Sequence, residues 1–457
     1  MHRPTNTSAF QPQAPGPGLI PLLRSLQSLR ENPLTFLQNS AEKYGDIVQF
    51  RLGGLHAFLL NKPEYIQHVL QTNNHNYSKD TLQYNALAAI TGRGLLTSDG
   101  ELWLRQRRRM QPAFHRERTL SFGPLMVDAA VNMLEGWEAA AASGQVVDLD
   151  QELMRLTLEI LGKALLGVDL SREAPTLTAA VTIALDHIVN QLKSPRLLPG
   201  FIPTRANRQF QQAIRTLNQA VQEIIDKHVP GATETSDLLS LLITAGEKAD
   251  GPGMDARQLR DEVITILIAG HETVASALTW TCYLMAQHPA AVERMVNELE
   301  QTLQGRLPCV EDLTRLEYTR QVFDESLRLY PPAWLITRKC LEEDKIGGFR
   351  IPAGALMVIG VSAMHHHPAY WPDPQSFDPE RFNTARSAGR PRFAYLPFGG
   401  GPRLCIGSGF ALTEAPLVLA CIFQRFRLEL PANFSPQADP LVTLRPHPGI
   451  PVRLHRV

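Results

Sequence analysis

One ten-residue segment combines a cysteine, an arginine and several glycines at a spacing suited to a flat, anionic ligand. It reads F-G-G-G-P-R-L-C-I-G and spans residues 398–407. A final helix is expected to begin near Cys405, where free N–H groups and the helix dipole favour a thiolate. Glycines allow positive φ and close backbone approach, and Arg403 offers a cation to a carboxylate. Gly407 leaves room beside the helix, and Phe398 can shield the sulfur from water.

A second polar cluster lies inside a long, otherwise apolar helix predicted from about Asp255 to Gln287. It reads A-G-H-E-T over residues 269–273, and polar groups in a buried helix are costly unless they have partners or a purpose. Glu272 beside Thr273 is an acid beside an alcohol, a pair suited to proton delivery. The alternative is that Thr273 only bonds back to a helix carbonyl. His271 is expected to face away from the site.

The first segment matches F-x-x-G-x-R-x-C-x-G, and through it the chain resembles the cytochrome P450 family, in its soluble bacterial type. The second cluster is similar to the family's A/G-G-x-D/E-T stretch, and the motifs follow in family order over about residues 15–455. The resemblance implies a haem-thiolate monooxygenase that carries haem b, iron protoporphyrin IX. It makes Cys405 the axial ligand of the iron and Thr273 with Glu272 the catalytic pair. The cofactor-binding residues that it implies in these two segments are Ala269, Phe398, Gly401, Arg403, Cys405 and Gly407.

Further motifs imply contacts with the haem propionates. Trp103 and Arg107 lie four residues apart on one face of a predicted helix and match the family's W-x-x-x-R. Arg338 falls in the strand where the family often has another propionate contact. His366 stands where the family often has an arginine, so its contact with a propionate stays open.

The family also has a structural triad beneath the haem. By resemblance, its members here are Glu325 and Arg328 of an E-x-x-R helix and Arg381 of P-E-R-F. Their implied role is folding and haem retention. The run His365-His366-His367 is not expected to hold a metal, because three adjacent side chains cannot all face one ion in regular structure.

These residues must be positioned by a mainly α fold with a minor β lobe. Strand patterns near the start flank Gly53-Gly54, helical patterns dominate from about residue 100 to 330, and no G-x-G-x-x-G follows a strand. The resemblance implies the cytochrome P450 fold, with haem buried between the long oxygen-side helix and the cysteine-loop helix. Residues 1–18 are predicted to be an irregular arm and 19–457 a single domain, with a bend at Pro416 in the last helix. The predicted strands are Ile47–Leu52 and Ala57–Leu60, and further predicted helices are Val127–Ala141, Leu149–Leu166 and Asn207–His228.

Composition excludes several classes of protein. The 457 residues include 45 basic and 45 acidic side chains, so the bulk charge favours neither nucleic acid nor an anionic membrane. The five cysteines are scattered and never form C-x-x-C, which argues against a disulfide framework and fits a reducing compartment. We find no signal peptide and expect a cytoplasmic protein without stable membrane insertion.

The expected reaction inserts one atom of O2 into an apolar organic substrate, by hydroxylation or epoxidation. The alternatives are a peroxide-driven peroxygenase and a non-enzymatic haem-based sensor. No flavin or ferredoxin domain follows the cysteine helix, so we expect electrons from a separate ferredoxin or flavodoxin with its reductase. Arg105, Arg108, Arg109, Arg390 and Arg392 are the candidates for its basic docking patch; the alternative is a solvated charged face.

The substrate is expected to be a fatty acid, terpenoid or steroid-like molecule. This follows from the apolar residues in the segments that line the cavity in the family. Those residues are Leu87, Ala88, Ile90, Ala333, Trp334, Leu335, Ile336 and Leu444. The apolar loop Leu197–Pro203 resembles the family's mobile entrance; the alternative is an ordinary packed loop.

Overall fold

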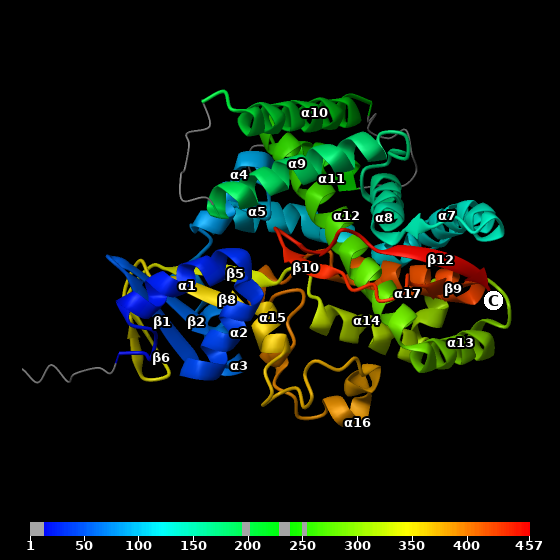
Figure 1. The fold of residues 1–457 in the computed structure, drawn as a ribbon. Coiled ribbons are helices and arrows are strands. Elements are labelled where there is room, and N and C mark those ends of the chain that lie inside the picture. Colours follow the sequence, from blue (N-terminus) through cyan, green and yellow to red (C-terminus); the bar gives the residue numbers. More distant parts are fainter. Residues whose placement is uncertain (1–12, 194–201, 228–237, 249–253) are drawn as a thin grey trace, which may run out of the picture. The chain divides into compact units, whose positions relative to one another are not determined.

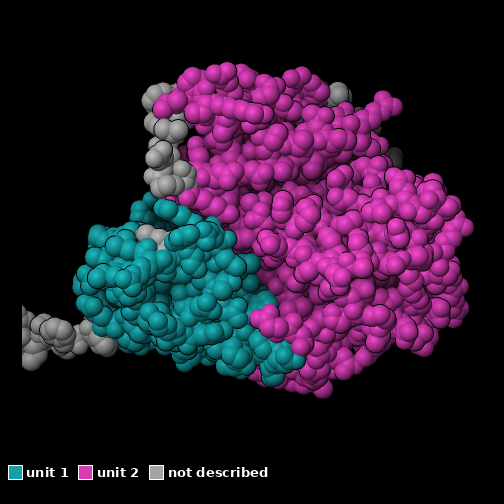
Figure 2. Space-filling view, in the orientation of Figure 1, with its two compact units in different colours: residues 1–81, 335–374, 391–403 teal, residues 82–334, 375–390, 404–457 magenta. Residues whose placement is uncertain are grey.

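A computed structural model describes residues 13–193, 202–227, 238–248 and 254–457 of the chain (Figure 1). The chain divides into two compact units, coloured separately in Figure 2. Unit 1 comprises residues up to 81, 335–374 and 391–403, and unit 2 comprises residues 82–334, 375–390 and 404–457. Most elements are helices and the sheets are small, which confirms the predicted fold class. The single domain from residue 19 to 457 stays a prediction.

Unit 1 is built around a five-stranded sheet with the strand order β1-β2-β8-β5-β3. The hairpin of β1 (Ile47–Leu52) and β2 (Leu55–Leu60) turns through Gly53, whose φ is +59°. Side chains such as Phe58, Met357 and Ile359 form its core and have no exposed surface. The other elements of unit 1 are α1 (Leu19–Glu31), α2 (Pro33–Tyr44), α3 (Pro63–Gln67), η1 (His68–Thr72), η2 (Asn74–Asn76), β3 (Tyr77–Ser78), β5 (Leu335–Cys340), β6 (Asp344–Ile346), β7 (Phe349–Ile351), β8 (Leu356–Gly360), α15 (Val361–His365), η6 (Arg392–Ala394) and η7 (Gly401–Arg403).

Unit 2 is helical, and the 32-residue helix α12 (Ala256–Gln287) runs through its middle (Figure 1). The Asp255 side chain caps its start by accepting a hydrogen bond from the Gln258 N–H at 2.7 Å. The helix ends before His288-Pro289, as predicted. Among the described residues, only α12 is long and apolar enough to cross a bilayer, but 83% of that apolar window is buried inside the protein. We therefore interpret α12 as a core helix.

The predicted helices of this unit are present with bounds shifted by a few residues: α7 (Gly123–Ser143), α8 (Leu149–Leu165) and α10 (Arg205–Lys227). The remaining elements of unit 2 are α4 (Leu82–Thr91), α5 (Gly100–Met110), η3 (Gln111–Phe114), α6 (Arg116–Ser121), β4 (Val147–Asp148), α9 (Ala174–Lys193), α11 (Leu238–Lys248), α13 (Pro289–Leu303), η4 (Val310–Thr314), α14 (Glu317–Leu329), η5 (Pro379–Phe382), α16 (Thr384–Ser387), α17 (Ser408–Arg425), β9 (Phe426–Glu429), β10 (Gln437–Pro440), β11 (Leu444–His447) and β12 (Pro451–Arg456).

Two small sheets and the last helix complete unit 2. The sheets have the orders β4-β12-β9 and β10-β11. Helix α17 packs against α7 and contacts α12. Pro416 lies buried inside α17, as predicted from the sequence, while the bend expected there stays a prediction.

Candidate active site

Cys405 is the exposed thiol of the chain. It lies three residues before the first helical residue of α17, and its carbonyl accepts a hydrogen bond from the Ser408 N–H at 3.4 Å. The buried thiols differ, because burial raises the pKa values of Cys282 and Cys421 to about 12. Around the helix start there is free space: the nearest atom to a Cβ on Gly407 would be a Phe114 ring carbon at 3.9 Å. Accessibility, a helix N-terminus and a clear approach are what a ligand thiolate needs.

Arg107 on α5 lies beside this thiol. Its Nη1 donates to the Leu404 carbonyl at 2.9 Å, next to Cys405 in the chain. Burial lowers the pKa of Arg107, while the Cys405 thiol acts in the opposite direction. Trp103 lies one turn earlier on α5 and is partly buried. The predicted residues Trp103 and Arg107 therefore both lie on α5, and Arg107 binds the residue that precedes Cys405.

One face of α12 is open in a helix that is otherwise buried from residue 261 to 285. Ala269 is exposed, and Gly270 and Thr273 are partly buried. Ala269 and Thr273 are i and i+4, so they lie on one side of the helix. A Cβ on Gly270 would come within 2.1 Å of a Leu161 methyl carbon, so this glycine also allows α8 to pack closely. The Thr273 hydroxyl donates to the Ala269 carbonyl at 2.7 Å, the back-bond considered as the alternative interpretation of the sequence.

Glu272 points away from this face and is buried. Its Oε1 accepts from the Thr443 hydroxyl at 2.9 Å and lies 3.7 Å from the Arg445 guanidinium. Burial raises its pKa to about 7, with Arg445 and Thr443 acting in the opposite direction. A carboxyl with this pKa is partly protonated at neutral pH and can both take up and release a proton.

His271 is also buried within α12. Its Nδ1 contacts the Leu267 carbonyl, and burial lowers its pKa to about 4. It is therefore neutral at physiological pH.

The predicted site residues of unit 1 lie on β5 and on the glycine loop. Arg338 is buried, and its Nη1 donates to the Thr337 carbonyl at 2.8 Å. Gly401 has φ +67°, and a Cβ there would be 1.8 Å from the Leu70 carbonyl oxygen. This glycine is therefore required by the chain's own packing, a reason that the sequence did not reveal. Phe398 and Arg403 are partly buried.

The structure brings Glu325, Arg328 and Arg381 together, as predicted. Arg328 donates to both oxygens of Glu325 at 2.7 and 2.8 Å, and Arg381 Nε lies 3.3 Å from Glu325 Oε1. The Asp378 N–H donates to the same oxygen at 3.0 Å, and Arg328 also donates to the Ser376 carbonyl at 3.1 Å. The cluster connects α14 with η5 and therefore stabilises the packing of these two elements within unit 2.

The three adjacent histidines use their rings separately. His365 is buried and its Nε2 accepts from the Leu396 N–H at 2.9 Å. His366 Nδ1 lies 2.8 Å from the Ser362 carbonyl, and His367 Nδ1 accepts from the Ala369 N–H at 3.2 Å. Within the described ranges, no group of three or more His, Cys, Asp and Glu residues could hold a metal ion.

Arg445 and Asp150, which face Glu272 from β11 and α8, were not predicted from the sequence. Leu444, which precedes Arg445, was predicted only as an apolar residue of the cavity lining. No local pattern could have indicated these contacts, because Arg445 is 295 residues from Asp150.

The apolar residues expected to line a cavity differ in exposure. Leu87, Ile90, Ile336 and Leu444 are buried, Ala88, Trp334 and Leu335 are partly buried, and Ala333 is exposed. Most of the expected entrance loop lies outside the described residues, which resume at 202. Of the expected basic patch, Arg105, Arg108 and Arg392 are exposed, whereas Arg390 donates to the Arg381 carbonyl at 2.7 Å and stacks on Phe382.

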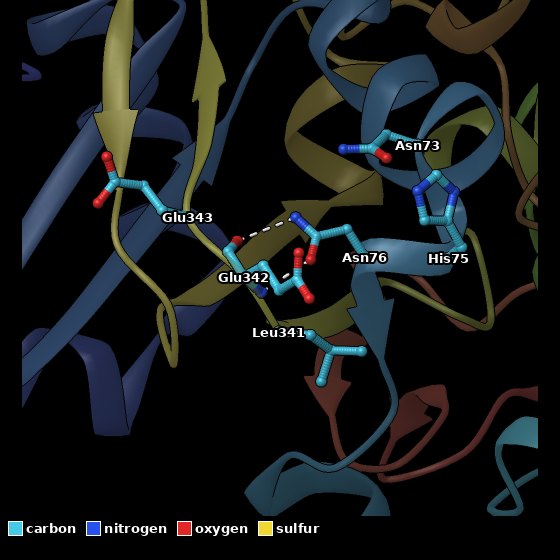
Figure 3. Close-up of a pocket in the computed structure, with 6 residues that line it drawn as sticks. All are labelled: Asn73, His75, Asn76, Leu341, Glu342 and Glu343. Atoms are coloured by element: carbon cyan, nitrogen blue, oxygen red, sulfur yellow. Dashed lines mark hydrogen bonds between the residues drawn. The ribbon is translucent and has the colours of Figure 1, made fainter.

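A hollow of about 260 Å³ lies in unit 1, at the junction of η2 with the β5–β6 turn (Figure 3). Its lining comprises Asn73, His75, Asn76, Leu341, Glu342 and Glu343. The Asn76 amide bonds the backbone carbonyl and N–H of Glu342 at 3.0 and 2.8 Å. These groups tie the turn, and none of the predicted site residues lines this hollow.

Comparison with known proteins agrees with this geometry. The family model for cytochrome P450 matches residues 14–452. Cyclooctatin synthase and cyclooctat-9-en-7-ol 5-monooxygenase of Streptomyces melanosporofaciens are 37% and 36% identical, over 90% of this chain and 89% and 88% of their own. Pentalenene oxygenase of Streptomyces avermitilis is 33% identical over 93% of this chain and 92% of its own. A crystal structure of the cytochrome P450DA heme domain superposes with a TM-score of 0.87, at 26% identity and 98% coverage of both chains.

Proposed function

The chain belongs to the cytochrome P450 family and is a haem monooxygenase, and from that premise we propose that Cys405 is the axial thiolate of its haem. The observation that carries the proposal is the single exposed thiol at the start of α17, with Arg107 beside it. The open positions of α12, Ala269 and Thr273, fit a flat cofactor, since both side chains there are small.

The cofactor that we propose is haem b. Arg107 and Trp103 would hold its propionates from α5, and Gly407 would leave room for the ring beside α17. From unit 1, the proposed contacts are Arg338, Phe398, Gly401 and Arg403. When bound, a thiolate-ligated haem supplies reductive activation of O2 and oxidation of C–H or C=C bonds.

The chain's own residues would manage protons. We propose that Glu272 takes protons from the interior side of α12 and that Thr273 presents its hydroxyl on the open face. The carboxyl is buried with a pKa of about 7, so it can be reprotonated in each turnover at neutral pH. The Thr273 hydroxyl keeps an acceptor lone pair while it donates to the Ala269 carbonyl, and it can exchange that partner for a ligand.

We propose a terpenoid-like substrate of low polarity. Two relatives are named for cyclooctat-9-en-7-ol and for pentalenene, and the apolar residues predicted to line the cavity suit such compounds. The electron donor that we propose is a ferredoxin or flavodoxin with its reductase, and the proposed compartment is the cytoplasm. Arg105 and Arg108 on α5 are exposed and offer a basic surface for an acidic donor.

The test is the absorption spectrum of the reduced protein with carbon monoxide. We expect a strongly red-shifted Soret band, which Cys405→Ser abolishes. Cys309→Ser is the matched control, because Cys309 is another thiol of unit 2 with some surface exposure. A red-shifted band that survives Cys405→Ser refutes the assignment of the thiolate ligand.

A further inference from the structure

The loop that joins α4 to α5, residues 92–99, is fastened to the second turn of α12 by two adjacent acidic side chains. The Arg93 N–H donates to Asp261 Oδ2 at 2.8 Å, and the Leu95 N–H donates to Glu262 Oε2 at 2.9 Å. Leu95 and both acids are buried, and Glu262 has no exposed surface. Breaking these bonds would leave buried polar groups without a partner, which is costly, so the loop is held firmly against α12.

Two glycines of the loop are required by this contact. Gly92 has φ +59°, and a Cβ there would lie 2.1 Å from Asp261 Oδ2. A Cβ on Gly94 would lie 2.0 Å from the Thr265 hydroxyl oxygen and 2.7 Å from the Asp261 carbonyl oxygen. The backbone of the loop therefore packs directly on the surface of α12, with no side chain between them.

Two further helices are tied to the same point. On α5, Gln106 Nε2 donates to the Arg93 carbonyl at 2.8 Å. Arg260 Nη1 donates to Asp261 Oδ1 at 2.5 Å, and its Nε donates to Asn218 Oδ1 on α10 at 2.9 Å. Asp261 thus connects the loop with α12 and, through Arg260, with α10.

The loop lies on the side of α12 that carries the open positions. Glu262, Thr265, Ala269 and Thr273 are i, i+3, i+7 and i+11, so they form one stripe along the helix. The loop contacts this stripe at Glu262 and Thr265, whereas Ala269 is exposed and Thr273 partly buried. Because four residues of helix span only about 6 Å, the loop borders the space in front of Ala269.

The loop also fixes the end of α4. That helix contacts α12 and carries Leu87, Ala88 and Ile90, three of the apolar residues predicted to line the substrate cavity. It ends at Thr91, directly before the fastened segment. A displacement of the loop from α12 would therefore move the C-terminal end of α4 with it.

We propose that Asp261 and Glu262 are positioning residues that hold the loop 92–99 and the end of α4 as one wall of the substrate cavity, and so determine the affinity for bulky apolar ligands. The inference rests on the proposed function, which places the haem and the substrate in front of Ala269. Neither acid contacts the ligand. When the loop is loosened, fewer molecules have the wall in place, and the apparent Kd rises by the inverse of that fraction.

The experiment compares the binding of 4-phenylimidazole and of imidazole to the full-length holoenzyme, followed by the shift of the Soret band. The phenyl ring must fit into the cavity, whereas imidazole needs little beyond the iron. We expect Glu262→Leu to raise the Kd of 4-phenylimidazole about tenfold or more, and that of imidazole less than about threefold, because the buried Leu95 N–H loses its acceptor. Glu262→Gln keeps an acceptor oxygen and should restore most of the affinity.

A second variant and a matched control complete the set. Gly94→Ala displaces the loop from its own side, because the added Cβ meets Thr265, and it should also raise the Kd of 4-phenylimidazole. It provides the test even if Glu262→Leu does not fold. Glu298→Leu is the control, because the Glu298 carboxylate on α13 likewise accepts two backbone N–H groups, at 2.5 and 2.9 Å, but from the start of α14. It should leave both Kd values unchanged.

Amide hydrogen exchange of residues 92–99, measured by mass spectrometry, reports the loop independently of ligand binding. We expect faster exchange in Glu262→Leu and Gly94→Ala than in wild type and Glu298→Leu. Unchanged 4-phenylimidazole affinity in both variants overturns the inference, whether or not exchange is faster. An equal rise in Kd for both ligands also overturns it, because the change would then lie at the haem. If wild type lacks the red-shifted carbon monoxide band, the proposed function fails and the inference with it, whereas a normal band in every variant with unchanged affinities removes the inference alone.

Discussion

Gly401→Ala tests whether the glycine loop is shaped by the chain's own packing. The φ of Gly401 is +67°, and a Cβ built there lies 1.8 Å from the Leu70 carbonyl oxygen and 2.7 Å from its carbon. Both atoms belong to the backbone of η1, so no side-chain rotation can relieve the clash. Either η1 or the loop must move.

The expected cost has two parts. A non-glycine residue at positive φ costs about 1–2 kcal/mol, and overpacking against fixed neighbours costs roughly 1–3 kcal/mol. Gly401→Ala should therefore destabilise the protein by about 2–5 kcal/mol. Gly399 is the matched control in the same loop, because its φ is +73° but the nearest atom to an added Cβ is the Ile336 methyl at 3.7 Å. Gly399→Ala should show only the backbone part, about 1–2 kcal/mol.

The assay is urea unfolding of the holoenzymes, followed by circular dichroism and Soret absorbance. We expect the unfolding midpoint to fall clearly further for Gly401→Ala than for Gly399→Ala. We also expect more loss of the red-shifted carbon monoxide band, because a displaced η7 moves the chain leading to Cys405. Equal effects of the two substitutions would refute the argument that contact with Leu70 is what requires Gly401.

Further predictions concern the buried charges and the proposed cofactor contacts. Glu325→Gln leaves Arg328 buried without its counter-charge and should lower the free energy of unfolding by about 3–5 kcal/mol. The control is Glu380→Gln, in the exposed pair with Arg294, which should lower it by under about 1 kcal/mol. Equal losses would contradict the structural role of Glu325. Arg107→Ala should speed transfer of haem to apomyoglobin while the exposed Arg108→Ala does not, and equal rates would remove the propionate assignment. Thr273→Ala should retain haem and its spectrum but divert reducing equivalents to peroxide, and fully coupled turnover would count against the hydroxyl. Burial raises the pKa of Glu272 from 4.5 to about 7. Between these two pH values, the free energy of unfolding of wild type should fall by about 3 kcal/mol relative to that of Glu272→Gln as the pH rises. Parallel curves of unfolding free energy against pH would show that the pKa of this carboxyl is not raised in this way.

Local patterns were sufficient for the elements that carry the site. Strand patterns on either side of Gly53-Gly54 predicted the β1–β2 hairpin, and Asp255 with His288-Pro289 predicted both ends of α12. These features depend on residues a few positions apart, where capping and turn preferences decide the conformation. The spacing of Trp103 and Arg107 likewise placed both on α5.

Long-range packing could not be predicted in this way. The glycines of the loop were interpreted as room for a ligand, whereas Gly401 is also required by the backbone of Leu70, more than 300 residues earlier in the chain. The Arg445 pairs with Asp150 and Glu272 join segments 295 and 173 residues apart. Such contacts follow from the fold as a whole, and a partly buried arginine in a short strand gives no local sign of its partner.

Three buried glutamates show that the hydrogen-bond and charge partners of a carboxyl, more than its burial, decide whether it has a structural or a chemical role. Glu325 has two arginines and a backbone N–H around its carboxylate, so its charge is compensated and fixed. Glu414 in α17 has an unpartnered Oε1, and burial alone raises its pKa well above the ordinary value, which keeps it neutral. Glu272 lies between these limits, with one cation at 3.7 Å, one hydroxyl and one free oxygen. Since proton transfer requires both protonation states to be accessible near neutral pH, only the third arrangement suits a group that must change its charge in each turnover.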